Sequence, residues 1–131
     1  MAKGTRGYIE RVLNQVNGCY EYGWFDACAV MMRRLMETLV IECYEQAGIA
    51  DKIKSPKTSE FYMLKDLIST ILVQPEFKIG RNAKHGLQRL KKIGGLSAHS
   101  RRFIAHREDI DKITTDFHVV CQELLYLAKL K

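Results

Sequence analysis

The sequence predicts an all-α protein, a single helical bundle of four to five helices in one domain spanning residues 1–131. Apolar residues recur at spacings of three and four along several segments, which is the spacing of one helix face. No segment alternates apolar and polar residues over a useful length, and Val, Ile and Thr are not clustered, so no sheet is expected. The 47% hydrophobic and 27% charged residues are ordinary globular values, and a chain of this length buries a core without metal or disulfides.

The first two helices are predicted from their apolar patterns. In residues 8–19 the apolar side chains share one face, and this helix is expected to end between Gly18 and Gly23. Residues 24–47 carry an apolar band too wide for a surface helix, so the segment is predicted to be the central helix. Gly48 follows at the position where a helix often ends in a left-handed residue.

The middle of the chain is predicted to hold a loop and two shorter helices. Residues 51–57 are expected to form an exposed loop. Ser55 and Pro56 are typical of a cap followed by proline at the first helical position, so a third helix is predicted from there to Pro75. A fourth helix is predicted over about residues 82–93, where Gly94 and Gly95 interrupt the pattern.

The last helix has the clearest pattern in the chain. Its apolar positions step by three and four: Ile110, Ile113, Phe117, Val120, Leu124 and Leu127. Glu108, Asp109 and Asp111 place negative charge at its amino-terminal end, where the helix dipole favours it. Residues 96–107, by contrast, show no sustained period, and a loop is expected there.

Positive charge is concentrated in one stretch of the sequence. Between Phe77 and Arg107 there is no Asp or Glu, whereas nine Lys or Arg and three of the four His lie there. Because the whole chain has a net charge of +6, the remaining residues carry about −3. Concentrated charge raises the local potential, so polyanions are the expected partners, nucleic acid before a membrane surface. The alternative interpretation is a solvated helix face with no partner.

Within this stretch the predicted fourth helix has a basic stripe opposite its apolar residues. The stripe consists of Arg81, Lys84, His85, Gln88, Lys91 and Lys92. Arg81, Lys84, Lys91 and Lys92, together with Arg102 further on, are the predicted substrate-binding residues.

The absence of particular sequence features predicts the cellular compartment and the state of the cysteines. There is no run of eighteen apolar residues, and the first residues lack the apolar stretch of a signal peptide, so we expect a cytoplasmic protein without a membrane partner. The four Cys form no C-x-x-C pair and have no ligand spacing with His. We therefore expect buried free thiols, no metal site and no cofactor.

Arg101 and His106 are the strongest candidates for chemistry. Histidine titrates near neutral pH, and arginine presents a fork of donors that matches phosphate oxygens. Such a pair suits metal-independent RNA cleavage, in which a base removes the proton of a 2′-hydroxyl group and a cation holds the charge that develops on phosphate. His99 and Arg102 are close enough in sequence to join them. A hydrogen-bonded or surface histidine without a catalytic role is the alternative.

Two stretches resemble the HEPN superfamily, small helical domains named for nucleotide binding in higher eukaryotes and prokaryotes. One is Gly23-Trp24-Phe25-Asp26-Ala27-Cys28-Ala29-Val30-Met31-Met32-Arg33-Arg34-Leu35-Met36-Glu37, which is similar to the Arg-x-x-x-Glu segment of the family's second helix. The other is Lys91-Lys92-Ile93-Gly94-Gly95-Leu96-Ser97-Ala98-His99, before the long last helix. The resemblance spans about residues 8–130 and is closest to the stand-alone bacterial branch.

The resemblance implies a metal-independent endoribonuclease whose Arg-x(4 to 6)-His segments meet across a homodimer interface. Two assignments remain open, because His99 matches the family histidine by position and the pair Arg101 and His106 matches by spacing. Under the first assignment, Lys91 or Lys92 stands where the family has Arg, and lysine lacks the bidentate fork. Gly95 also stands where the family has Asn.

Further alternatives concern supporting residues and function. Arg33 and Glu37 are interpreted either as supports for the motif loop or as a surface ion pair. Tyr22, Trp24 and Phe25 are interpreted as base-stacking platforms or, by their spacing, as core or dimer contacts. The rival function is a non-catalytic HEPN module that binds nucleic acid, a nucleotide or a cognate partner in a toxin–antitoxin or defence system. A third interpretation is a helical interaction protein with an acidic partner.

Overall fold

The computed structural model describes residues 4–91 and 105–130, and within these ranges it confirms the all-α prediction. The elements are α1 (Thr5–Glu21), α2 (Phe25–Gln46), the short 3-10 helix η1 (Ala50–Ile53), α3 (Leu64–Ile71), α4 (Arg81–Leu90) and α6 (Arg107–Leu127). The described residues contain no strand, and an isolated antiparallel bridge joins Lys54 to Phe61. None of the described helices is both long and apolar enough to cross a membrane.

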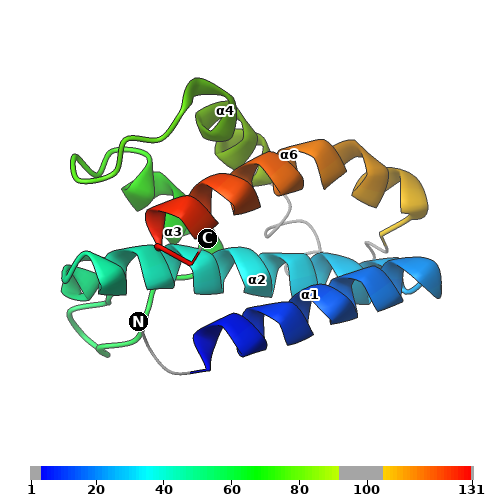
Figure 1. Ribbon diagram of the computed structural model, residues 1–131, viewed down its shortest axis with the longest axis horizontal. Coiled ribbons are helices and arrows are strands. Elements are labelled where there is room, and N and C mark those ends of the chain that lie inside the picture. Colours follow the sequence, from blue (N-terminus) through cyan, green and yellow to red (C-terminus); the bar gives the residue numbers. More distant parts are fainter. Residues whose placement is uncertain (1–3, 92–104, 131) are drawn as a thin grey trace.

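The second helix, α2, is the centre of the bundle, as its wide apolar band predicts. It contacts α1, α3, η1 and α6, whereas α4 packs against α6 on the outside (Figure 1). In Figure 1, α1 and α2 run antiparallel, and α6 runs in the same direction as α2. Leu39, Val40, Cys43 and Tyr44 of α2 are completely buried. Burial of these side chains is the main stabilising term of the fold.

Two glycines form the chain reversals around α2. Gly23, between α1 and α2, has φ +79°, and Gly48, after α2, has φ +74°. These are left-handed conformations that side chains with a Cβ atom rarely adopt. The predicted ends of the first two helices are therefore confirmed.

The predicted start of the third helix is wrong. The structure begins α3 at Leu64, whereas Pro56 lies in a turn. The Ser59 N–H donates to the Ser55 carbonyl at 2.9 Å, and the Ser55 N–H donates to the Glu60 carbonyl at 2.8 Å. Proline is favoured both in turns and in the first turn of a helix, because both positions require a φ close to the one that the proline ring imposes. The segment before it is also not simply an exposed loop, since Ile53 is completely buried.

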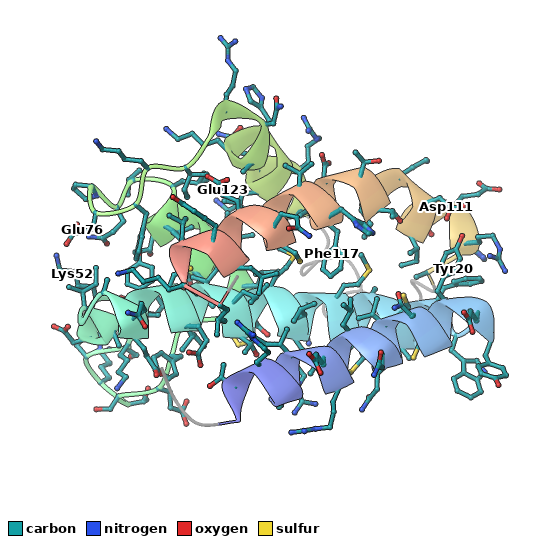
Figure 2. The ribbon with its side chains drawn as sticks, in the orientation of Figure 1. Tyr20, Lys52, Glu76, Asp111, Phe117 and Glu123 are labelled. Atoms are coloured by element: carbon teal, nitrogen blue, oxygen red, sulfur yellow. The ribbon has the colours of Figure 1, made fainter. Side chains whose placement is uncertain are left out.

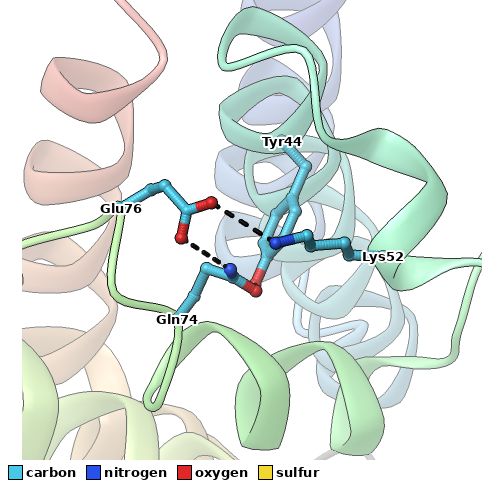
Figure 3. A network of polar contacts seen from close by, with 4 residues as sticks. All are labelled: Tyr44, Lys52, Gln74 and Glu76. Carbon is cyan, nitrogen blue, oxygen red and sulfur yellow. Dashed lines mark hydrogen bonds and ion pairs between the residues drawn. The ribbon is translucent and has the colours of Figure 1, made fainter.

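A polar network holds the segment between α3 and α4 against the end of α2 (Figure 3). The Tyr44 hydroxyl group donates to the Gln74 Oε1 atom at 3.1 Å, and the Gln74 Nε2 group donates to Glu76 Oε1 at 2.8 Å. Lys52 Nζ lies 3.4 Å from Glu76 Oε2. A tyrosine hydroxyl group is a donor at neutral pH, and burial raises the pKa of Tyr44 further. The network fixes the direction in which the chain approaches α4.

α4 lies close against α6 because Gly86 has no side chain. A Cβ atom at Gly86 would stand 3.0 Å from Val120 Cγ2 of α6. At the start of α4, the Gly80 N–H donates to Glu123 Oε1 at 2.9 Å. These contacts set α4 antiparallel to α6 and determine which face of α4 reaches solvent.

Candidate functional site

The basic stripe of α4 faces away from the bundle, as predicted. Ala83, Gly86, Leu87 and Leu90 are buried against the other helices. The opposite face exposes Arg81, Lys84, His85 and Gln88, Lys78 is exposed just before the helix, and Lys91 is half-buried just after it. This helix contains no Asp or Glu. Arg81, Lys84 and Lys91 of the predicted substrate-binding set therefore lie on or beside one surface.

Within residues 4–91 and 105–130, Arg89 is the one arginine of α4 that has a carboxylate partner. Its Nε and Nη2 atoms each donate to a carboxylate oxygen of Asp116 in α6 at 2.7 Å. The hydrogen bonds from Arg89 lower the pKa of Asp116 and, reciprocally, raise the pKa of the guanidinium. A bidentate pair of this kind fixes α4 on α6 and removes Arg89 from the set of cations that can hold phosphate. The sequence stripe alone does not reveal this, because Asp116 lies 27 residues away.

The start of α6 is anchored to the turn between α1 and α2. The Arg107 guanidinium lies 4.9 Å from the ring centroids of both Tyr20 and Phe25. The Tyr20 hydroxyl group donates to Asp111 Oδ1 at 2.6 Å, and Figure 2 shows these two residues together at this end of the molecule. The Ala105 N–H donates to Asp26 Oδ1 at 3.3 Å. These contacts hold the last residues before α6 in place.

His106 occupies the cap position immediately before α6 and its side chain is exposed. Its backbone N–H donates to Asp109 Oδ2 at 2.8 Å, which fixes the residue by its main chain. In the sequence His106 is followed by one cation, Arg107, and by three carboxylates, Glu108, Asp109 and Asp111. Among the described residues, this acidic neighbourhood opposes the approach of phosphate to His106.

Four predicted site residues lie outside the described part of the chain: Lys92, His99, Arg101 and Arg102. The structure consequently neither brings Arg101 and His106 together nor separates them. The segment that carries these residues begins after Lys91, at the end of α4, and ends at Ala105, beside α2.

Arg33 and Glu37 do not form a freely exposed pair. Both side chains are half-buried on α2, near the start of α3. Burial raises the pKa of Glu37, while the positive charge of Arg33 and the Leu64 N–H act in the opposite direction. The contact with Leu64, the first residue of α3, is a role for Glu37 that helical spacing does not predict. Whether the pair supports the segment before α6 stays a prediction.

The cysteines are unpaired, as predicted, and their environments disfavour reactivity. Cys28 and Cys43 are buried, and Cys19 and Cys121 are half-buried. Burial raises the pKa of Cys28 to about 11 and the pKa of Cys43 and Cys121 to about 12. These three thiols are protonated at neutral pH and are poor nucleophiles and metal ligands. In residues 4–91 and 105–130 no group of three or more His, Cys, Asp or Glu is arranged to hold a metal ion.

Comparison with protein-family models found no matching family, and searches of curated proteins and of solved structures found no significant match. The likeness to the HEPN superfamily therefore rests on the two sequence stretches quoted above.

Proposed function

We propose that this chain is a HEPN-like domain that binds RNA through the outer face of α4. The supporting observation is that Lys78, Arg81, Lys84 and Lys91 gather around one helix that has no carboxylate of its own. The α6 carboxylates that reach α4 are already engaged, Asp116 by Arg89 and Glu123 by the Gly80 N–H. In the part of the chain that the structure describes, no ion pair joins Lys78, Arg81, Lys84 or Lys91 to a carboxylate.

RNA is the partner that this surface fits best. An exposed row of flexible cations attracts a phosphate backbone without requiring a particular base sequence. In the sequence, residues 92–104 add Lys92, Arg101 and Arg102 to the same basic stretch. A simple solvated helix face would share the exposure but would show no preference for polyanions.

The proposal is tested by measuring RNA affinity as a function of salt. We expect the logarithm of the association constant to fall with the logarithm of salt concentration with a slope of roughly −2 to −3, which corresponds to about four phosphate contacts on a single strand. The double variant Arg81→Gln/Lys84→Gln is expected to reduce this slope by about one or more. Lys57→Gln/Lys65→Gln is the matched control, because it removes the same charge from exposed positions on other elements.

Two results would contradict RNA binding by α4. One is binding that does not depend on salt. The other is an equal loss of affinity in the α4 variant and in the control, which would indicate an effect of net charge alone. An acidic protein that displaces RNA while RNA fails to displace that protein would favour the interaction-protein interpretation.

The second proposed function is metal-independent RNA cleavage in a homodimer, with His106 or His99 transferring protons and Arg101, helped by Arg102, holding phosphate charge. The supporting observation is the exposed side chain of His106 at a fixed backbone position next to this segment. Because three carboxylates follow His106 closely, Arg101 and Arg102 must reverse the local charge before phosphate binds there.

Cleavage predicts fragments that end in a cyclic phosphate when RNA is incubated with the protein in excess chelator. His106→Ala or His99→Ala should abolish the fragments without changing RNA affinity, and the variant that does so identifies the functional histidine. Intact RNA at stoichiometric protein would refute cleavage. That result combined with salt-dependent binding would support the non-catalytic module, whose partner is RNA, a nucleotide or a cognate protein of a toxin–antitoxin or defence system.

A further inference from the structure

A cavity of about 470 Å³ lies between α1, α2 and α6, on the side of α6 away from α4. Its floor is α2, with Cys28, Met32, Leu35 and Leu39, and its two walls are α1 and α6. The volume falls in the range of small-molecule sites, which are concave and mostly apolar with a few polar groups. None of the residues proposed to bind RNA lines this cavity.

The cavity changes from polar to apolar along its length. Because α1 and α6 are antiparallel, Asn17 and Tyr20 near the end of α1 stand at the same end as Asp111 and Thr114 near the start of α6. Figure 2 shows Tyr20 and Asp111 at that end, and the buried Phe117 lies further along α6. At the opposite end the lining consists of Ile9, Leu13, Leu39 and Leu125. His118 and Gln122 stand on the α6 wall between the two ends.

The charge of the lining is opposite to that of the chain as a whole. Among the described residues, no Lys or Arg lines the cavity, although the chain has 21 of them, and Asp111 is the lining carboxylate. In the ranges that the structure describes, the hydrogen bond to Asp111 comes from the Tyr20 hydroxyl group, at Oδ1, so Oδ2 can accept a further donor. Thr114 lines the cavity, and its hydroxyl group donates to the Ile110 carbonyl, so the hydroxyl oxygen can still accept a hydrogen bond. The polar end therefore complements a donor or a cation.

The walls offer no covalent chemistry to a bound molecule. The Cys28 thiol donates to the Val16 carbonyl at 3.5 Å, and burial keeps both lining thiols, Cys28 and Cys121, protonated at neutral pH. A ligand here is held by apolar contact along its body and by hydrogen bonds at one end.

We propose that this cavity binds a small elongated molecule with an apolar body and a protonated amine, the amine lying against Asp111 and Tyr20 and the body extending toward Leu39 and Leu125. The apolar contact supplies most of the affinity, since each buried methylene group leaves water. The carboxylate supplies the preference for a cationic head over a neutral or anionic one.

The test compares three probes of equal chain length, 1-octylamine, 1-octanol and octanoate, as competitors for the neutral fluorophore N-phenyl-1-naphthylamine at neutral pH. We expect the amine to bind roughly threefold or more tightly than the alcohol, because Asp111 is exposed and its attraction is partly screened, and octanoate to bind most weakly. Asp111→Asn is expected to abolish the advantage of the amine while leaving octanol affinity nearly unchanged. Glu108→Gln is the matched control, since it removes a carboxylate from the same helix outside the cavity.

Two further variants locate the binding in the cavity. Thr114→Trp and Leu13→Trp each place a large ring in the cavity from a different wall. At least one of these variants should bind the fluorophore and the probes roughly tenfold more weakly. The same variant should unfold at the wild-type midpoint, which shows that it is folded. Leu13 tolerates this change more readily, because it is already 41% exposed. Failure of all three probes to displace the fluorophore, equal binding of amine and octanoate, or unchanged binding in a folded blocked variant would overturn the proposal. If the blocked variants instead convert a dimer to a monomer and no probe binds, the cavity belongs to an interface between two copies, which also overturns it.

Discussion

Gly86 is the residue at which α4 comes closest to α6, and it gives a prediction with an internal control. A valine there places its Cβ atom 3.0 Å from the buried Val120 side chain, so we expect Gly86→Val to destabilise the fold by about 1–3 kcal/mol through overpacking. Gly18 lies within α1, where an added Cβ atom would meet nothing within 4 Å. Gly18→Ala should therefore stabilise by about 0.5–1 kcal/mol. Urea unfolding measures both, and equal effects of the two substitutions would contradict this account of α4 packing.

The buried thiol of Cys43 predicts how stability changes at alkaline pH. An unfolded thiol releases its proton near the ordinary value of 9.0, whereas burial in the folded state raises the pKa of Cys43 to about 12. Both states keep the proton below about pH 8, so the thiol has no effect there. Above the unfolded value, the unfolded chain gains stability as a thiolate while the folded chain does not, and folding stability falls as pH rises.

This effect is measured by unfolding wild type and Cys43→Ala at about pH 8 and about pH 10. The stability lost between the two pH values should be smaller in the variant by about 1 kcal/mol. Ile68→Val also removes buried volume but has no titrating group, so it should show the full wild-type loss. A wild-type loss in Cys43→Ala would show that other groups cause the alkaline dependence.

At the scale of elements, the docking of α6 depends on Arg107 lying over two rings. We expect Arg107→Gln to destabilise the fold by about 0.5–1 kcal/mol, the usual value of an exposed cation–π contact. A double-mutant cycle with Phe25→Leu isolates the contact, since the second substitution should have less effect once Arg107 is gone. Additive effects of the two substitutions would indicate that Arg107 acts on α6 in another way.

The sequence predicts best those helices in which the apolar spacing and the end signals indicate the same boundaries. In α2 and α6 the spacing continues for several turns, and Gly48 or Asp109 marks an end, so propensity, pattern and capping indicate the same structure. Pro56 is compatible with a turn and with the first turn of a helix, and the local sequence does not distinguish between the two. Ile53 lies in too short a segment to show a period, and its burial depends on contacts with α2. Boundaries of this kind are set by tertiary packing.

The candidate site likewise has features that the sequence predicts and features that it does not. Helical spacing predicts that Arg81 and Lys84 share the outer face of α4, because this follows from local geometry. It does not predict that Arg89 is diverted to Asp116, or that a cavity opens between α1 and α6, because both depend on how separate helices pack. The carboxylates of Glu108 and Asp109 have two effects, since they are favourable dipole partners of α6 and they also oppose phosphate at His106.

At the scale of the whole molecule, the net charge of +6 is unevenly distributed, with cations around α4 and carboxylates at the start of α6. A polyanion is therefore expected to meet α4 first. Two copies that associate near the α1–α2 turn would place their acidic α6 ends close together unless the segment before α6 brings its arginines between them. The cleavage proposal thus requires a particular dimer, which makes the site of association decisive.

The exposed aromatic pair at the α1–α2 turn is where we expect two copies to associate. Tyr22 and Trp24 are 74% and 63% exposed, so they are not part of the core. Their rings stack with centroids 5.5 Å apart. Two adjacent exposed aromatic rings are typical of interface anchors, because their burial excludes much apolar surface from water. We expect Tyr22→Ala/Trp24→Ala to remain at 15.1 kDa in light scattering at concentrations where wild type approaches twice that mass.

Tryptophan fluorescence gives a second measurement of the same association, because Trp24 is the one tryptophan of the chain. Its emission should shift to shorter wavelength as wild-type concentration rises, since the ring leaves water. Tyr126→Ala is the control, as Tyr126 is equally exposed, at 72%, but lies at the other end of α6 and should leave the dimer intact. A dimer that persists in the double variant would place the interface elsewhere. A wild type that stays monomeric would remove the basis for cleavage across a dimer, and it would leave RNA binding by α4 as the function to pursue.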